Sequence, residues 1–251
     1  MALLGSRKGW FNRLNTLLFR YRPVARICYP VMRAGRNVLL RILGVTKIRN
    51  LDPRRNEPVF KQVFGEKWHD LPPVMQAHYG PRANTGDRVT LEGVLDVSVS
   101  PFVRLLSRLT GMLVPYSGQR VPVTVTLRSN PGSSGLEFDR VFHYPHRGDV
   151  RFRSRMEVVR ENQLVEIMRF GIGWRFVCDW DDMNITLRHR GYVWRIFGIL
   201  MPLPLGLALG NGVAGETPMS DSEFRMWTHA RHPWWGVTFG YAGHFKISDV
   251  S

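Results

Sequence analysis

The sequence has few cysteines and no long apolar run. Among 251 residues there are 2 cysteines, Cys28 and Cys178, too few for a disulfide framework or a four-thiolate zinc site. No stretch of about eighteen apolar residues is free of charges and helix breakers, which argues against a plain transmembrane helix. The N-terminus lacks the apolar core and small-residue cleavage site of a secretory signal. We therefore expect a globular protein of a reducing compartment, the cytoplasm.

Acidic residues are missing from the first fifth of the chain. Lys and Arg number 35 against 20 Asp and Glu, for a formal net charge of +15. Residues 1–51 carry eleven of these bases and no acid, so residues 52–251 hold 24 bases and all 20 acids. This asymmetry predicts two parts, a basic arm over 1–51 and a nearly balanced domain over 52–251.

The apolar residues of the arm recur at helical spacing, as Trp10, Phe11, Leu14, Leu17 and Leu18 show. A basic amphipathic helix with Trp and Phe on its apolar side is typical of proteins that lie in the headgroup layer of an anionic membrane. Six arm residues are the predicted membrane contacts: Trp10, Phe11, Arg13, Arg20, Arg26 and Arg33.

Three alternatives compete for the arm. Its apolar stripe could dock on the protein's own domain, or the arm could be an Arg-rich organelle-targeting peptide, although it has little Ser. Nucleic-acid binding is disfavoured because the charge excess lies in the arm and not among the aromatic residues of the domain.

The balanced region alternates apolar and polar residues, as in Val89, Leu91, Leu95, Val97 and Val99. The turns between such stretches are too short for the crossover helices that parallel strands need. The sequence predicts an α+β fold, with a large curved antiparallel β-sheet or partly closed barrel, a few short helices and the N-terminal basic helical arm. Further strands are predicted near 121–127, 136–144, 150–158, 164–170, 172–180, 183–189 and 235–247.

Two charged residues fall on the apolar side of their predicted strands. Arg140 is in register with Phe138 and Phe142, and Glu166 is in register with Leu164. An unpaired charge there would cost several kcal/mol. The two could pair and simply fix the core, a β-bulge could rotate the register, or they could receive the polar head of a ligand.

The segment 192–210 is unusually apolar, and Pro202 and Pro204 forbid a continuous helix in it. We expect a loop that caps a cavity, enters a membrane surface or meets a partner. The following Gly210–Gly215 stretch matches the dinucleotide fingerprint, but no βαβ unit surrounds it. His143 and His146, like His229 and His232, lack further ligands, so we expect neither a cofactor nor a metal ion.

The balanced region resembles a bacterial family, domain of unknown function 4166, over roughly residues 59–247. Short motifs carry the resemblance in order along the chain: Phe64-Gly65, Leu71-Pro72, His78, Gly93, Val121-Pro122-Val123, Arg140-x-Phe142, Leu164-Val165-Glu166, Pro202-Leu203-Pro204, Glu216 and Gly240-Tyr241-x-Gly243. Phe138 stands where the family often has Trp. The resemblance implies no established reaction, but such domains often accompany dehydrogenase-like or thiol-oxidoreductase-like modules.

Residues 23–37 of the arm resemble the C-terminal tail of a small thioredoxin-like family named for an Asp-Cys-Cys motif. That motif is missing here, since no two cysteines are adjacent. Cys28 would then be a small apolar residue and not a nucleophile.

We expect a non-catalytic module that binds a lipid or other apolar small molecule and is peripherally associated with the anionic inner membrane. In this interpretation Arg140 and Glu166 orient a polar head and Phe142 belongs to the binding site. Pro202, Leu203 and Pro204 belong to a lid, Glu216 holds the lid's return, and Tyr241 lines the wall. The alternative is an enzyme, or an accessory domain of an oxidoreductase system with a partner protein, that acts on an apolar substrate.

Overall fold

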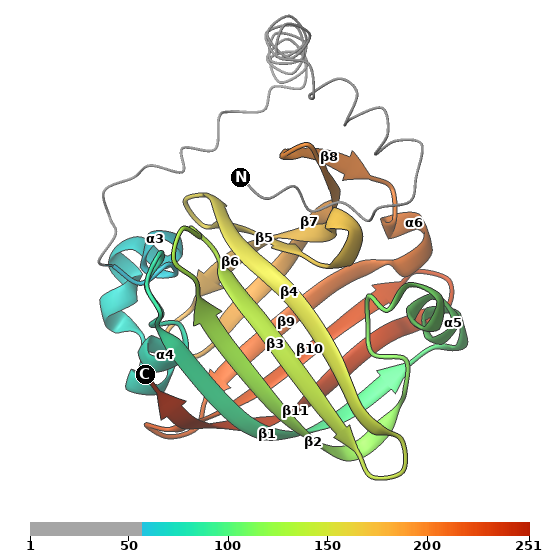
Figure 1. The fold of residues 1–251 in the computed structure, drawn as a ribbon, viewed down its shortest axis with the longest axis horizontal. Helices are drawn as coiled ribbons and strands as arrows, with labels where there is room; N and C mark the ends of the chain where they lie inside the picture. The colour runs from blue at the N-terminus through green and yellow to red at the C-terminus, as the bar shows by residue number, and fades with distance from the viewer. Residues whose placement is uncertain (1–56) are drawn as a thin grey trace, which may run out of the picture. The chain divides into compact units, whose positions relative to one another are not determined.

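The computed structural model describes residues 57–251, which form an antiparallel β-barrel with a few short helices (Figure 1). The predicted antiparallel sheet is confirmed, and it closes fully. The strands are β1 (Arg88–Val99), β2 (Gly118–Ser129), β3 (Leu136–Tyr144), β4 (Gly148–Arg160), β5 (Gln163–Ile167), β6 (Ile172–Trp180), β7 (Ile185–Ile196), β8 (Ile199–Leu203), β9 (Asn211–Pro218), β10 (Glu223–His232) and β11 (Gly236–Val250).

Ten strands form the closed ring, in the order β6-β5-β4-β3-β2-β1-β11-β10-β9-β7, and pairing of β6 with β7 completes it. Every described pairing between strands is antiparallel, which fits their short connections. β8 is the exception to the ring, since it extends β7 as a hairpin. Closure leaves the ring without the unpaired edges that an open sheet exposes.

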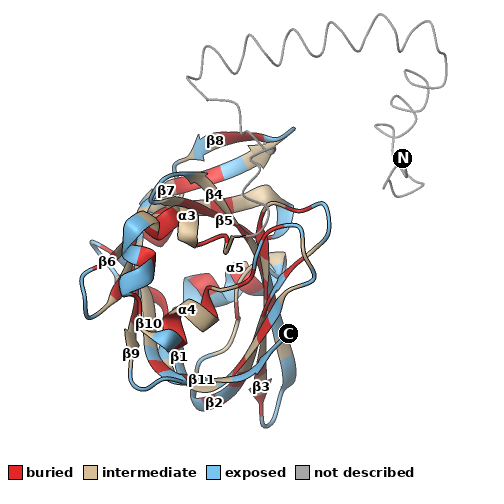
Figure 2. Ribbon diagram, turned by 90° about the vertical axis from the view of Figure 1, so that its left-hand side faces the viewer, coloured by how far each residue is buried: buried red, intermediate tan, exposed pale blue. Residues whose placement is uncertain are grey.

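The alternating sequence pattern sets which side chains fill the barrel. Along β1 the buried residues are Val89, Leu91, Leu95, Val97 and Val99, as their spacing predicts. Buried side chains from the other strands join them in one large apolar cluster. Figure 2 colours the buried residues red along the strands. Burial of these large apolar side chains is the main favourable term for folding, at about 1.5–3 kcal/mol for each.

Short helices lie at both ends of the barrel. One end is covered by α3 (Lys61–Phe64), the 3-10 helix η1 (Gly65–Asp70) and α4 (Pro73–His78), and the other carries α5 (Pro101–Thr110) and α6 (Gly206–Leu209) (Figures 1 and 2). α5 begins where the Ser100 hydroxyl accepts a hydrogen bond from the Val103 N–H at 3.3 Å, and it ends at Gly111 in the left-handed conformation.

The expectation of a loop over 192–210 is wrong. β7 continues to Ile196, turns at Phe197 and Gly198, and pairs with β8 before α6 follows. Pro202 is tolerated because β8 is an edge strand, paired on one side only. On its open side no neighbouring strand needs the N–H that proline lacks. The two prolines therefore exclude a helix, as expected, but not a strand.

Trp10, Phe11, Arg13, Arg20, Arg26 and Arg33 lie outside the described residues, as does the proposed domain boundary at residues 51 and 52. Within residues 57–251, no helix has the length and apolar character needed to cross a membrane.

Candidate functional site

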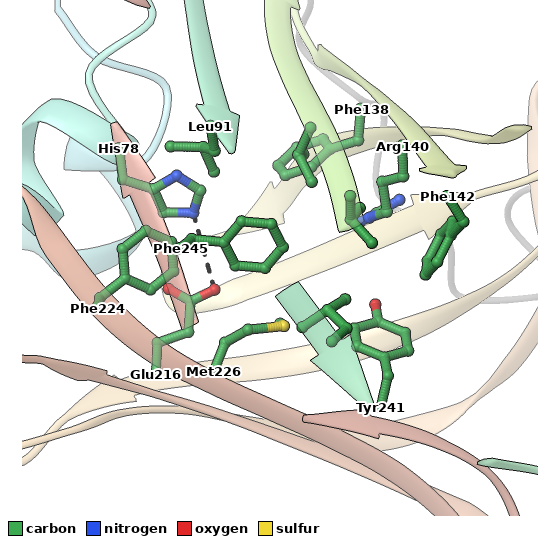
Figure 3. A pocket seen from close by; sticks show the side chains of 13 residues that line it. His78, Leu91, Phe138, Arg140, Phe142, Glu216, Phe224, Met226, Tyr241 and Phe245 are labelled. Atoms are coloured by element: carbon green, nitrogen blue, oxygen red, sulfur yellow. Dashed lines mark ion pairs between the residues drawn. The ribbon is translucent and has the colours of Figure 1, made fainter. Parts of the chain in front are cut away.

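A cavity of about 50 Å³ lies inside the barrel, with both apolar and ionisable side chains on its wall (Figure 3). The lining residues come from α4 and from strands β1, β2, β3, β9, β10 and β11: His78, Leu91, Leu95, Val123, Val125, Phe138, Arg140, Phe142, Glu216, Phe224, Met226, Tyr241 and Phe245. Buried ionisable groups around an apolar cavity are a common arrangement at binding sites.

Arg140 and Glu166 form an ion pair, with Nη2 of the arginine 3.0 Å from Oε1 of the carboxylate. The Ser154 hydroxyl donates to the same oxygen and accepts from Arg140 Nη1 at 2.9 Å. The Trp174 indole donates to the second carboxylate oxygen at 2.7 Å. Both oxygens of a deeply buried carboxylate are thus hydrogen-bonded, which is what makes its burial tolerable.

Two aromatic rings hold the Arg140 guanidinium in place. Its central carbon lies 5.0 Å from the ring centroid of Phe138 and 4.9 Å from that of Phe152, within the range of cation–π attraction. Burial, the largest single influence, lowers the pKa of Arg140, but the acidic groups around it, Glu166 first among them, together more than offset this, and the pKa is raised. Arg140 is therefore a fixed positive charge on the cavity wall.

A second polar cluster lies at the α4 end of the cavity. The Tyr79 hydroxyl donates to Glu216 Oε2 at 2.7 Å. His78 Nε2 lies 3.7 Å from Glu216 Oε1, the contact that is dashed in Figure 3. Burial, and then the Glu216 charge, raise the pKa of Tyr79 well above its usual value, so this hydroxyl stays a donor. His78 is packed against the Phe224 ring at 4.9 Å between centroids, and its Nδ1 has no partner within residues 57–251.

The Tyr241 hydroxyl points into the cavity (Figure 3). Burial raises the pKa of Tyr241, so the group is a neutral phenol that can donate or accept. In the described part of the chain it makes no hydrogen bond. The ring packs edge-on against Phe142 and Phe239, at 6.2 and 5.7 Å between centroids, which fixes the direction of the hydroxyl.

Strand parity predicted that Arg140, Phe142, Glu166 and Tyr241 share the apolar side of their strands. In the structure Arg140, Phe142 and Tyr241 line the cavity, Glu166 lies directly behind Arg140, and Glu216 is a further lining residue. Glu216 does not hold a lid, however, because it belongs to β9 and contacts α4 residues inside the barrel.

The predicted lid residues are not part of the site. Pro202 and Leu203 belong to β8, Pro204 follows it, and none of the three lines the cavity. This correction follows from the hairpin pairing of β7 with β8, which uses the apolar segment as sheet. Part of the apolar character of the segment instead builds a second small core, in which Val193 and Leu200 pack with residues of β5.

Sequence reasoning did not assign His78 and Tyr79 to the site. They come at the end of α4 and directly after it, where no strand parity applies. One signal was available. The segment after the Leu71-Pro72 motif is too short to be stable by itself, so it must pack against the rest of the domain. No group of three or more His, Cys, Asp and Glu side chains within 57–251 is arranged to hold a metal ion.

A family model described as a domain of unknown function, DUF4166, matches residues 71–245. The match spans more than two thirds of the chain and includes all the cavity-lining residues. The chain belongs to this family. The DUF4166 domain is thus the barrel itself, together with α4, whose residues complete the cavity wall.

Two solved structures are similar to the DUF4166 chain at low identity. One, from M. tuberculosis, is Rv2717c, which has 12% identity and a TM-score of 0.38 and covers 74% of this chain and 99% of its own. The other is a porin-like protein from Bacteroides uniformis with 7% identity and a TM-score of 0.21, covering 67% of this chain and 98% of its own. A search of the curated proteins found no match.

Proposed function

We propose that the barrel binds an uncharged apolar molecule carrying one hydroxyl or carbonyl group, without catalysis, in the cavity beside Tyr241. The observation that supports this most directly is the hydroxyl of the partly buried Tyr241, which lies on the cavity wall among apolar side chains and makes no hydrogen bond to the described residues. Its hydrogen-bonding capacity is therefore open to water or to a bound molecule. A ligand with a hydroxyl or carbonyl would supply that hydrogen bond.

The charges around the cavity favour an uncharged ligand. Arg140 is already neutralised by Glu166, and Glu216 is a further buried acid whose nearest donor is Tyr79. Arg140 is the one Lys or Arg side chain on the described cavity wall, whereas two buried carboxyl groups, Glu166 and Glu216, lie at or directly behind that wall. A ligand carboxylate or phosphate would be repelled in this low-dielectric space, whereas a hydroxyl could donate to Glu216 or accept from Tyr241.

The size of the cavity narrows the earlier prediction of a lipid. A volume of about 50 Å³ holds a few water molecules, and an apolar cavity three times larger accommodates benzene. A long acyl chain does not fit unless side chains move. Met226 is the flexible, half-buried member of the wall, so its rotation is the simplest way to enlarge the space. We therefore propose a small apolar molecule.

Membrane attachment through the arm is part of this proposal, because it would place the barrel where apolar molecules concentrate. The acid-free basic sequence of residues 1–51 supports it. The oxidoreductase alternative depends on a partner protein. Cys178 does not favour thiol chemistry within the barrel, since burial raises its pKa and lowers the fraction of reactive thiolate.

The test is calorimetric titration of the full-length protein with the straight-chain alcohols butanol, hexanol and octanol, and with octanoate. We expect affinity to rise with alcohol length until the cavity is full, and octanoate to bind at least tenfold more weakly than octanol. Tyr241→Phe should weaken alcohol binding about fivefold through loss of one hydrogen bond. Tyr144→Phe is the matched control, because Tyr144 bonds the Tyr116 carbonyl away from the cavity.

Equal binding of octanol and octanoate would contradict the charge argument, and absence of heat with every alcohol would contradict the proposal itself. Native mass spectrometry of gently purified full-length protein is the second measurement. An uncharged apolar molecule retained by the wild type and lost from Tyr241→Phe supports the proposal, and an anionic lipid retained by both overturns it.

A further inference from the structure

The connections at one end of the barrel form a continuous ring, which we call the basic end: residues 100–117, 145–147, 168–171, 197–210 and 233–235. Hydrogen bonds link most of its members. Arg169 Nη1 donates to the Thr110 carbonyl at 3.3 Å, and the Trp194 indole donates to the Phe170 carbonyl at 3.0 Å. His232 Nε2 lies 3.0 Å from the Leu207 carbonyl. The Ser100 N–H donates to the Thr238 carbonyl at 2.9 Å, which brings the start of α5 to β11.

Exposed apolar side chains gather at this end. Thirteen large apolar residues within 57–251 are exposed, and ten belong to the basic end or to the strand ends beside it. The ten are Phe102, Leu105, Leu109, Phe170, Trp194, Phe197, Leu207, Trp234, Trp235 and Val237. Scattered exposed apolar residues need no explanation, but a ring of them, including three Trp and three Phe, indicates an interaction surface.

The α5 helix turns its apolar stripe away from the barrel. Val103 and Ser107 are its buried residues, while Phe102, Leu105 and Leu109 follow one another at helical spacing on the exposed side. Arg104 and Arg108 are also exposed and border that stripe. A helix that served only the core would bury the three large apolar residues and not the serine.

Two neighbouring turns each present a phenylalanine to solvent. Phe170-Gly171 and Phe197-Gly198 both have positive φ at both residues, 62° and 78° in the first pair and 50° and 81° in the second. Asn-Gly is the favoured pair for such backbone geometry, and bulky side chains are disfavoured there. Phe197 is 86% exposed, so it gains little from burial within the barrel that would offset this preference. Neither turn is explained by local folding.

The two ends of the barrel differ in charge. The basic end contains Arg104, Arg108, Arg147 and Arg169 and no acid. The connections at the opposite end (residues 57–87, 130–135, 161–162, 181–184 and 219–222) contain eight acidic and three basic residues. An anionic surface would therefore attract one end and repel the other, which orients the barrel as well as binding it.

We infer that the basic end docks on an anionic lipid surface, with the exposed Trp and Phe side chains in the headgroup layer and the arginines against lipid phosphates. Aromatic residues at such a layer, with arginines and no acids, match the chemistry of membrane interfaces. This contact belongs to the barrel itself and is additional to the arm. It does not depend on what occupies the cavity.

The test compares two matched double variants of the full-length protein in flotation with vesicles of phosphatidylcholine containing 30% phosphatidylserine, a proportion chosen to be about that of an anionic leaflet. Phe170→Asn with Phe197→Asn should lower vesicle binding tenfold or more, while its unfolding midpoint stays the same or rises, since Asn suits both turns. Met183→Asn with Met219→Asn removes exposed apolar residues at the opposite end and should change binding less than twofold.

A fluorescent label separates contact by the barrel from contact by the arm. In a chain with Cys28→Ala, an environment-sensitive dye at Phe197→Cys should shift to the blue on the anionic vesicles, and a dye at Met219→Cys should not. An unshifted dye at position 197 on vesicle-bound protein would show that the arm alone binds and would overturn the inference. A dye already shifted without vesicles would overturn it too, because the surface would then be covered by the chain itself or by a second copy.

Discussion

Arg140 on β3 and Glu166 on β5 form an ion pair of 3.0 Å across the strand that lies between them, and their side chains are only 12% and 5% exposed. β4 separates their strands and contributes Ser154, which bonds both partners. The pair thus ties three strands together from the inside.

Removal of one partner should be far more costly than removal of both. Arg140→Met leaves the Glu166 carboxylate buried without its counter-charge and should reduce the free energy of unfolding by about 3–5 kcal/mol. Arg140→Met with Glu166→Leu should recover part of that loss. Urea denaturation of the full-length protein measures both. The exposed pair Arg128–Glu137 is the control, worth less than about 1 kcal/mol, and equal effects at the two sites would contradict the assignment.

Tyr79→Phe should destabilise the barrel because Glu216 loses its closest hydrogen-bond donor. The expected loss is about 1.5–3 kcal/mol, the range for a hydrogen bond to a charged group. Tyr144→Phe, which removes a bond to a neutral backbone carbonyl, should cost about 1 kcal/mol. Chemical denaturation at neutral pH compares the two variants. If Tyr79→Phe lowered the free energy of unfolding no more than Tyr144→Phe does, the Tyr79 hydroxyl would not be the group that stabilises the buried Glu216 carboxylate.

Asp87 should contribute stability that disappears in acid. Its carboxylate accepts hydrogen bonds from the backbone and side chain of Arg82, which lower its pKa from 3.8 to about 2. Since the folded-state pKa is the lower one, the contribution is complete above about pH 4 and is lost as the pH falls through about 2. Asp87→Asn should cost about 1 kcal/mol at pH 7, given the exposure of the pair.

Thermal denaturation of wild type and Asp87→Asn across pH 7 to 2 measures this difference. The two stability curves should converge in acid. A constant gap would mean that the ion pair with Arg82 is not its source.

Gly243→Ala should strain the contact between β11 and β1. An added Cβ would collide with the Val94 carbonyl oxygen and would lie 2.9 Å from Leu95 Cδ2. Backbone cannot move aside as a flexible side chain does, so we expect a loss of about 1–3 kcal/mol. Gly86→Ala, in open space, should be neutral or stabilising by up to about 1 kcal/mol. Thermal shift measurements would compare the two variants. Equal melting temperatures would show that the close contact at Gly243 does not limit the side chain there.

Period-two alternation predicted the barrel and its inward-facing residues because strand geometry alone decides which side chains share a face. That rule alone predicted that Arg140 and Glu166 face the interior. It could not show that β6 meets β7, since ring closure depends on pairing between strands and not on the pattern within one. The DUF4166 resemblance added the order of motifs and no geometry.

The errors have a common physical origin. The segment around Pro202 was interpreted as a lid because apolar residues were assumed to cover the barrel interior. The structure instead exposes Phe197 and Leu207 and packs Leu200 in a second small core. His78 was not assigned to the site because short helices carry no parity signal, and only tertiary packing aims its ring at Glu216. Residue periodicity predicts which side chains share one face of a strand or helix. Both errors concern the packing of one strand or helix against another, which periodicity does not describe.

Because β6 pairs with β7, the barrel wall has no gap between strands through which a ligand could enter or leave. Exchange between interior and solvent must then take place through one of the two ends. At one of them the barrier is α4, only six residues long, which carries His78 and precedes Tyr79. The dissociation rate of any bound molecule would then depend on how often α4 opens. Hydrogen exchange of the α4 backbone amides would measure the same opening.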